Sequence, residues 1–143
     1  MAHGLSLLVQ VKGLGEGADA VSAVMAPLDP ADTTAGPNIL HYVWAVPVPN
    51  QNDPPGVTSL LLTTVYDEDF DSYIRDLVLA NPDPFNEAAK VIVGLEGLIP
   101  VQDNLSQFIE FVRDHDLTRG GTLPFTEAYP YTVVQIENCF SDA

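Results

Sequence analysis

The segment from Ile39 to Tyr73 constrains the fold more than any other part of the sequence. It contains two runs of strand-favouring residues, 39–46 (ILHYVWAV) and 59–66 (SLLLTTVY), in which β-branched and aromatic side chains are frequent. The second run leads directly into the acidic residues 67–71 (DEDFD), a composition typical of the first turn of a helix. The segment therefore predicts two strands and a helix in close succession.

Two further strands are predicted, one near each end of the chain. A loop must separate the two central runs, because residues 47–56 contain four prolines, two asparagines and one glycine. Together with the apolar runs near the two ends of the chain, the predicted strands cover residues 5–11, 39–47, 57–66 and 131–137.

Apolar residues that repeat at intervals of three and four predict the helices. One helix is expected over residues 16–28, a second after Asp67 as its N-cap, a third over 85–96, and a fourth after Asp103 or Asn104. The second has the clearest pattern, a wide apolar stripe along one face. The residues expected to face the core are Phe70, Tyr73, Ile74, Leu77 and Val78 in the second helix, Phe85, Ala88, Ala89 and Ile92 in the third, and Leu105, Phe108, Ile109 and Val112 in the fourth.

The order of elements, β-α-β-β-α-α-α-β, is that of a ferredoxin-like α+β fold with an extra helical hairpin before the last strand. We predict one domain over residues 1–143, in which a four-stranded antiparallel sheet carries its helices on one face. In this topology the first and third strands are central, and the second and fourth are edges. Pro47 and Pro130 fit this arrangement, because an edge strand tolerates a missing N–H group.

The strands are apolar on both of their faces, which a sheet with helices on one face does not require. The second strand, for example, places Tyr42, Trp44 and Val46 on one face and Val43 and Ala45 on the other. A large apolar surface usually contacts another molecule. We expect a second copy of the chain to cover the second face, which gives a homodimer that forms an α+β barrel.

The charge of the chain argues against two classes of partner. Twenty acidic and five basic residues give a net charge of −15. Nucleic acids are bound mainly through their phosphates, and anionic membrane surfaces attract basic segments, so neither partner is expected. No apolar run approaches the roughly 20 residues of a membrane span, and the N-terminus predicts a strand and not a signal peptide. These features predict a cytoplasmic protein.

Chemistry that depends on cysteine or on a metal is not expected. Cys139 is the one cysteine of the chain, so it forms no intrachain disulfide and no cysteine-based zinc site. A zinc site without cysteine would need more histidines than the sequence offers. No metal is therefore predicted.

Four blocks of sequence carry a resemblance to known proteins. The blocks are 41–44 (HYVW), 60–73 (LLLTTVYDEDFDSY), 111–115 (FVRDH) and 127–136 (EAYPYTVVQI). In this order they resemble a poorly characterised family of dimeric α+β barrel proteins, loosely grouped with peroxidase-related sequences. The pattern of that family is roughly His-Phe-Ala-Arg, an apolar strand ending in Asn-Tyr-Asp, and Asp-x-Tyr. The resemblance implies the dimeric barrel fold more firmly than it implies an activity.

The chain departs from the family pattern at two positions. Trp44 stands where the family usually has a basic residue, and Val65 stands where it has asparagine. An anion or carboxylate site built on the basic residue is therefore not implied for this chain.

The candidate site is predicted around His41, with Tyr66, Tyr73 and His115 as the nearest polar residues. On a strand beside aromatic residues, His41 can be an axial haem ligand or a general base, or a structural histidine bonded to a carbonyl or hydroxyl group. His115 follows a helix, whose dipole favours a cation at its end. Buried tyrosines usually pack in the core with the hydroxyl bonded to a partner. A functional and a structural interpretation therefore stay open for each residue.

Two functions are consistent with these residues. The first is a non-enzymatic homodimer that binds a small, mostly apolar molecule without a cofactor. The second is a haem- or oxygen-dependent oxidoreductase of the peroxidase or monooxygenase type on the same scaffold, with His41 as ligand or base. A Soret band in the purified protein would favour the second, whereas the few histidines and the missing basic residue favour the first.

Overall fold

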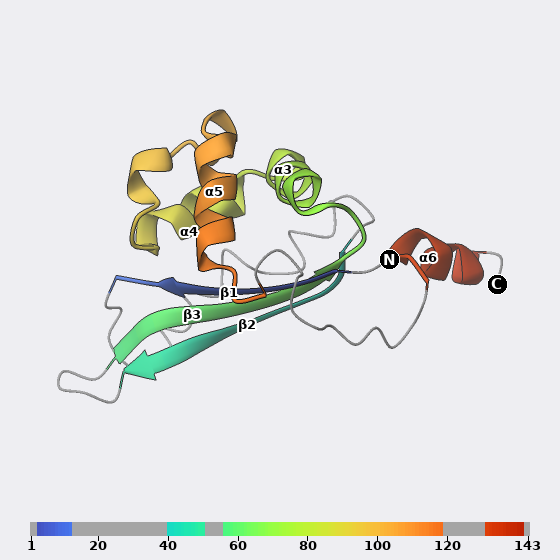
Figure 1. Cartoon of the computed structure of the whole chain (residues 1–143), viewed down its shortest axis with the longest axis horizontal. Helices are drawn as coiled ribbons and strands as arrows, with labels where there is room; N and C mark the ends of the chain where they lie inside the picture. The colour runs from blue at the N-terminus through green and yellow to red at the C-terminus, as the bar shows by residue number, and fades with distance from the viewer. Residues whose placement is uncertain (1–2, 13–39, 51–55, 119–130, 142–143) are drawn as a thin grey trace.

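We describe residues 3–12, 40–50, 56–118 and 131–141 of the chain in a computed structural model. These residues form an α+β fold, in which a three-stranded antiparallel sheet carries helices on one face (Figure 1). The helix expected over residues 16–28 lies outside the described residues.

The first three predicted strands are confirmed as β1 (His3–Gln10), β2 (Leu40–Asn50) and β3 (Gly56–Tyr66). Their order in the sheet is β1-β3-β2, and both outer strands run antiparallel to β3. The loop predicted over residues 47–56 is too long, because β2 continues to Asn50 and β3 begins at Gly56. An edge strand tolerates the missing N–H groups of Pro47 and Pro49. The central place predicted for the third strand is therefore observed in the described sheet.

Three of the predicted helices are confirmed as α3 (Phe70–Ala80), α4 (Asp83–Val91) and α5 (Leu105–His115). The short 3₁₀ helices η2 (Glu96–Leu98) and η3 (Val101–Asp103) lie between α4 and α5. The buried residues of the three apolar stripes are Tyr73, Ile74 and Val78 in α3, Ala89 in α4, and Phe108, Ile109 and Val112 in α5. Figure 1 shows these helices together on one side of the sheet.

The N-cap of α3 is Asp69, so the prediction of Asp67 is wrong. The Asp69 carboxylate accepts a hydrogen bond from the backbone N–H of Ser72 at 3.1 Å, and hydrogen bonds to Ser72 lower the pKa of Asp69. Asp67 instead accepts a hydrogen bond from the backbone N–H of Val133 at 2.8 Å. Asp67, Glu68 and Asp69 are consecutive acidic residues, and the backbone conformation decides which of them caps the helix.

The prediction of a strand over residues 131–137 is wrong, because Val133–Ser141 forms a helix, α6. Its first turn is a capping box, in which two side chains satisfy each other's backbone N–H groups. The Thr132 hydroxyl accepts from the N–H of Gln135 at 3.2 Å, and the Gln135 side-chain oxygen accepts from the N–H of Thr132 at 2.8 Å. Figure 1 shows α6 beyond one end of the sheet.

Within the described residues, two connecting segments bond to the edge of β1 where the fourth strand was expected. The N–H of Leu117, after α5, donates to the carbonyl oxygen of Ser6 at 2.8 Å, and the N–H of Val93, after α4, donates to that of Gln10 at 2.9 Å. The buried Asp116 carboxylate also accepts from the N–H of Ser6 at 3.3 Å. These hydrogen bonds satisfy backbone groups of Ser6 and Gln10 that would otherwise pair with a neighbouring strand.

The face of the sheet away from the helices is mostly apolar and partly exposed. Leu60, Leu62 and Thr64 face the helices, so the alternate residues Leu61 and Thr63 face away. The strand register places further side chains on this open face, and its exposed large apolar residues are Leu8 at 39%, Trp44 at 58% and Val48 at 38% of their full surface. We call this surface the open sheet face.

Candidate functional site

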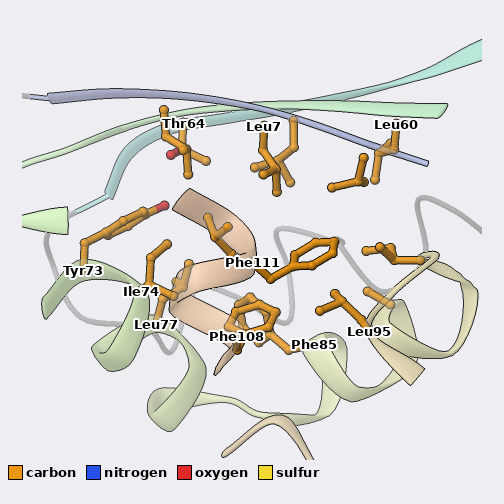
Figure 2. Close-up of a pocket in the computed structure, with 16 residues that line it drawn as sticks. Leu7, Leu60, Thr64, Tyr73, Ile74, Leu77, Phe85, Leu95, Phe108 and Phe111 are labelled. Atoms are coloured by element: carbon orange, nitrogen blue, oxygen red, sulfur yellow. The ribbon is translucent and has the colours of Figure 1, made fainter. Parts of the chain in front are cut away.

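A cavity of about 110 Å³ lies between the sheet and the three helices α3, α4 and α5 (Figure 2). Its roof is the middle of the sheet, where Leu7 of β1 pairs directly with Leu62 of β3. Both leucines are only half-buried, although Leu5 and Val9 on either side of Leu7 are each 2% exposed. The helices therefore cover the ends of this stretch more closely than its middle, which leaves the cavity.

Aromatic and aliphatic side chains from the helices form the opposite wall. Figure 2 shows Phe85 of α4 and Phe108 and Phe111 of α5 beside one another, with Leu77 of α3 next to them. The rings of Phe85 and Phe108 meet edge to face, with centroids 6.1 Å apart and planes at 80°, a favourable arrangement for aromatic pairs. This wall offers an apolar surface that a flat ring or a short alkyl chain can contact.

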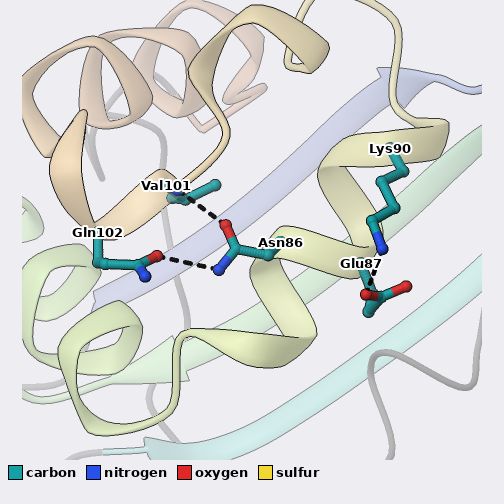
Figure 3. A network of polar contacts seen from close by, with 5 residues as sticks. All are labelled: Asn86, Glu87, Lys90, Val101 and Gln102. Carbon is teal, nitrogen blue, oxygen red and sulfur yellow. Dashed lines mark hydrogen bonds and ion pairs between the residues drawn. The ribbon is translucent and has the colours of Figure 1, made fainter.

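The position of α4 in this wall is fixed by a polar network around Asn86 (Figure 3). The Asn86 side-chain oxygen accepts from the N–H of Val101 at 2.8 Å, and its amide nitrogen donates to the side-chain oxygen of Gln102 at 2.9 Å. Both partners belong to η3, so the network ties α4 to the segment that leads into α5. On the exposed side of α4, Lys90 pairs with Glu87 at 2.5 Å.

Two residues of the lining carry hydroxyl groups, but their oxygens are buried and the cavity surface itself is almost wholly apolar. Thr64 of β3 is 2% exposed and Tyr73 of α3 is 0% exposed, and both side chains line the cavity. In the part of the chain that the structure describes, neither hydroxyl has a hydrogen-bond partner. Figure 2 shows the Tyr73 hydroxyl directed toward Thr64. Buried polar groups are nearly always hydrogen-bonded, so this pair of hydroxyls is unusual.

The hydroxyl of Tyr73 keeps its proton at neutral pH. Burial raises its pKa because the charged phenolate is poorly solvated in the core, and the nearby Tyr66 adds to the shift. The Thr64 hydroxyl partly opposes this shift, although the two groups do not meet the geometry of a hydrogen bond. Tyr73 is therefore a neutral, buried phenol beside the cavity.

Tyr66, the last residue of β3, packs against the ring of Tyr73. Their rings stack with centroids 4.0 Å apart and planes at 6°, and the Tyr66 side chain is 1% exposed. Burial raises the pKa of Tyr66 to about 12, with smaller contributions from the negative charges of Asp116 and Asp69. The stack holds the Tyr73 ring in one orientation.

Of the two histidines of the predicted site, His115 is not among the cavity residues. The ring of His115 stacks on Phe111, with centroids 4.1 Å apart, and its Nδ1 lies 2.8 Å from the Phe111 carbonyl oxygen. Because a carbonyl can only accept, Nδ1 carries the proton of this bond. His41 belongs to β2, where the register shifts between Leu40 and Tyr42, and its side chain lies outside the described residues.

The structure thus brings Tyr66 and Tyr73 together. It places the His115 ring against Phe111, which is a residue of the cavity wall. Thr64 and the three phenylalanines of the wall are cavity residues that the sequence reasoning did not select. Thr64 could have been found from the alternation of β3, because it follows Leu60 and Leu62 on the inward-facing side. The phenylalanines were expected only as core residues.

The cavity does not fit a haem. The described residues that line it include no histidine, cysteine or methionine, and its one tyrosine is held protonated. Its volume of about 110 Å³ is also well below the roughly 300–1,000 Å³ of typical sites for drug-sized ligands and cofactors.

Comparisons with known proteins give no relative: no protein-family model, no curated protein and no solved structure matches the chain. The resemblance to dimeric α+β barrel proteins therefore stays a prediction. Among the described residues, no group of three or more His, Cys, Asp or Glu side chains is placed to hold a metal ion. None of the helices in the described ranges has the length and apolar character that crossing a membrane requires.

Proposed function

We propose that the chain binds a small, mostly apolar molecule in the cavity between the sheet and the helices. The observation that carries this proposal is a cavity of about 110 Å³ that is lined almost entirely by aliphatic and aromatic groups. An apolar cavity of roughly 150 Å³ is large enough to bind benzene. At about 110 Å³ this cavity is smaller, so a molecule no larger than one aromatic ring suits this site, and its burial would be favourable by roughly 25 cal/mol per Å² of apolar surface.

The cavity supports binding better than acid–base catalysis. General acids and bases work best when their pKa lies near the working pH. The pKa of Tyr73 is raised instead, and none of the described residues that line the cavity is a carboxylate, an imidazole or an amine. The described groups favour a binding protein over an enzyme.

The same proposal includes a homodimer joined through the open sheet face. Trp44 lies opposite Thr63 of β3, and Leu8 and Val46 both lie opposite Leu61, so the side chains form continuous rows across the strands. The strands β1, β2 and β3 contain no acidic or basic residue other than histidine. Two copies of a chain with a net charge of −15 could therefore meet here without placing like charges in contact.

Binding is tested by titrating the full chain with benzene and toluene and measuring both thermal stability and amide chemical shifts. A ligand that binds only the folded state raises stability by about 2.7 kcal/mol at 100 times its Kd, so the melting temperature should rise with ligand concentration. The Ala88→Leu variant fills the cavity from α4 and should lose this response. The matched Ala80→Leu variant, at the exposed end of α3, should keep it.

Two outcomes would contradict the proposal. The first is a wild-type chain with no change in stability or chemical shifts at near-saturating benzene or toluene. The second is a purified protein with a Soret band and oxygen- or peroxide-dependent activity, which would support the oxidoreductase alternative around His41.

A further inference from the structure

The chemistry of the cavity surface limits what the ligand can be. From this surface we infer that the ligand is a small hydrocarbon, of at most one ring, that carries no hydrogen-bonding group. This inference rests on the proposed function, because it names the chemical class bound at the same site.

The described lining offers a ligand no hydrogen-bonding partner. Thr64 and Tyr73 are the two residues of this lining with polar side chains, and the others are aliphatic or aromatic. The oxygen atoms of both hydroxyls are buried, and Figure 2 shows the Tyr73 hydroxyl directed toward Thr64. A polar group on a ligand would therefore lose its hydrogen bonds to water and gain none in return.

A water molecule cannot supply the missing partner either. A buried water typically makes about three hydrogen bonds to polar groups of the protein. The walls of the cavity present hydrocarbon side chains, which include Leu7 and Leu62 from the sheet and Phe85, Phe108 and Phe111 from the helices. Because apolar cavities stay dry, a polar group of a ligand cannot be bridged to the protein by water.

The surroundings also exclude a charged ligand. None of the described residues that line the cavity is charged. A buried charge is very unfavourable without a compensating partner. Arg113 does not supply one, because it pairs with Asp71 and lies over the Phe70 ring, and none of these three residues lines the cavity.

The aromatic wall is held in place by residues outside the lining. The ring of Phe111 stacks on the ring of His115 with centroids 4.1 Å apart. It also packs closely on the backbone of Gly94, where an added Cβ would lie 3.2 Å from Cε2 of the ring. Gly94 has a φ of 97°, a conformation that glycine adopts readily and other residues rarely do. A preorganised wall loses little freedom when a ligand binds, so its contacts favour a rigid apolar ring.

The test compares two pairs of probes of matched size on the whole chain. Toluene and phenol differ in a hydroxyl group, and benzene and pyridine differ in a ring nitrogen that accepts hydrogen bonds. Dissociation constants come from amide chemical shifts, followed at residues of β3, α4 and α5. A hydrophobic pocket rejects an added hydroxyl by up to about 100-fold. We expect phenol to bind at least about tenfold more weakly than toluene, and pyridine at least about tenfold more weakly than benzene.

Two variants of Leu62 test whether the missing partner causes this preference. Leu62 faces the cavity from the middle of β3. Leu62→Thr adds a hydroxyl to the cavity wall, whereas Leu62→Val has nearly the same shape without one. A new hydrogen bond contributes roughly two- to tenfold in affinity. The preference for toluene over phenol should therefore be smaller by about this factor in Leu62→Thr than in Leu62→Val.

A third variant, Thr64→Val, is the control for the hydroxyl that is already present. Its oxygen is buried and has no hydrogen-bond partner in the described part of the chain, so the variant should fold. The affinities for all four probes should be the same as in the wild type, because this oxygen does not reach the cavity surface.

The outcomes separate this inference from the proposed function. Phenol that binds as tightly as toluene, or pyridine that binds as tightly as benzene, overturns the inference and leaves the proposed function standing. Equal preferences in Leu62→Thr and Leu62→Val do the same, as does a selective loss of phenol affinity in Thr64→Val. No binding of any of the four probes overturns both.

Discussion

At the scale of single residues, the stacked pair Tyr66 and Tyr73 depends on its protonation state. Tyr66 and Tyr73 are 1% and 0% exposed, and burial raises the pKa of both hydroxyls. Two neutral rings stack readily in an apolar core, but a phenolate in the same place would lack solvent. The pair is therefore stable only while both phenols keep their protons.

This protonation predicts a loss of stability in alkaline solution. An unfolded tyrosine loses its proton near pH 10, whereas folded Tyr66 keeps it up to a pKa of about 12. Below about pH 10 both states are protonated and the contribution is complete. Above that pH the unfolded state releases protons that the folded state retains, so the free energy of unfolding falls as the pH rises toward about 12.

Urea unfolding, followed by circular dichroism at a series of alkaline pH values, measures this decline. The Tyr66→Phe variant should show a shallower decline than the wild type, because it lacks one of the two buried ionisable hydroxyls. The exposed Tyr131 provides the control, and Tyr131→Phe should decline like the wild type. Equal declines in the wild type and Tyr66→Phe would contradict the burial argument.

At the scale of elements, sequence patterns predict the sheet and the three central helices because local and tertiary preferences agree there. The stripe that contains Tyr73, Ile74 and Val78 favours a helix locally and is also buried against the sheet. At residues 131–137 the preferences disagree: β-branched and aromatic residues favour a strand, but Thr132 and Gln135 have the spacing of a capping box. The capping bonds form, and other segments bond to the edge of β1.

The candidate site is only partly predictable for a different reason. Tyr66 and Tyr73 stand out in the sequence as polar groups at a strand end and in a helix stripe. The cavity beside them depends on how closely α3, α4 and α5 pack over Leu7 and Leu62, and no local pattern contains that information.

The capping box makes a prediction about α6. Replacing Thr132 with alanine removes the hydroxyl that accepts from the N–H of Gln135, and loss of such a cap destabilises a helix by about 0.5–2 kcal/mol. Amide exchange in α6 should therefore become faster, while exchange in β3 stays unchanged. Thr132→Ser keeps a capping hydroxyl and should behave like the wild type. Unchanged exchange in Thr132→Ala would mean that the cap does not hold this helix.

At the scale of the whole molecule, charge and apolar surface are separated. The three strands contain no acidic or basic residue other than histidine, although the chain has a net charge of −15. Exposed acidic residues instead lie on the helices, among them Asp83 and Glu87 on α4 and Glu110 on α5. The helical layer therefore repels another copy of the chain more strongly than the open sheet face does.

This separation predicts a homodimer whose association depends on salt. Sedimentation at micromolar concentration should give twice the mass of 15.4 kDa calculated for one chain. Added salt should strengthen association, because it screens repulsion between the two acidic chains without weakening the apolar contact. Trp44→Glu places a charge in the middle of the open sheet face and should give monomers. Leu79→Glu alters a comparably exposed apolar residue on α3 and should leave the dimer intact. A wild-type monomer at all salt concentrations, or equal effects of the two substitutions, would contradict pairing through the open sheet face.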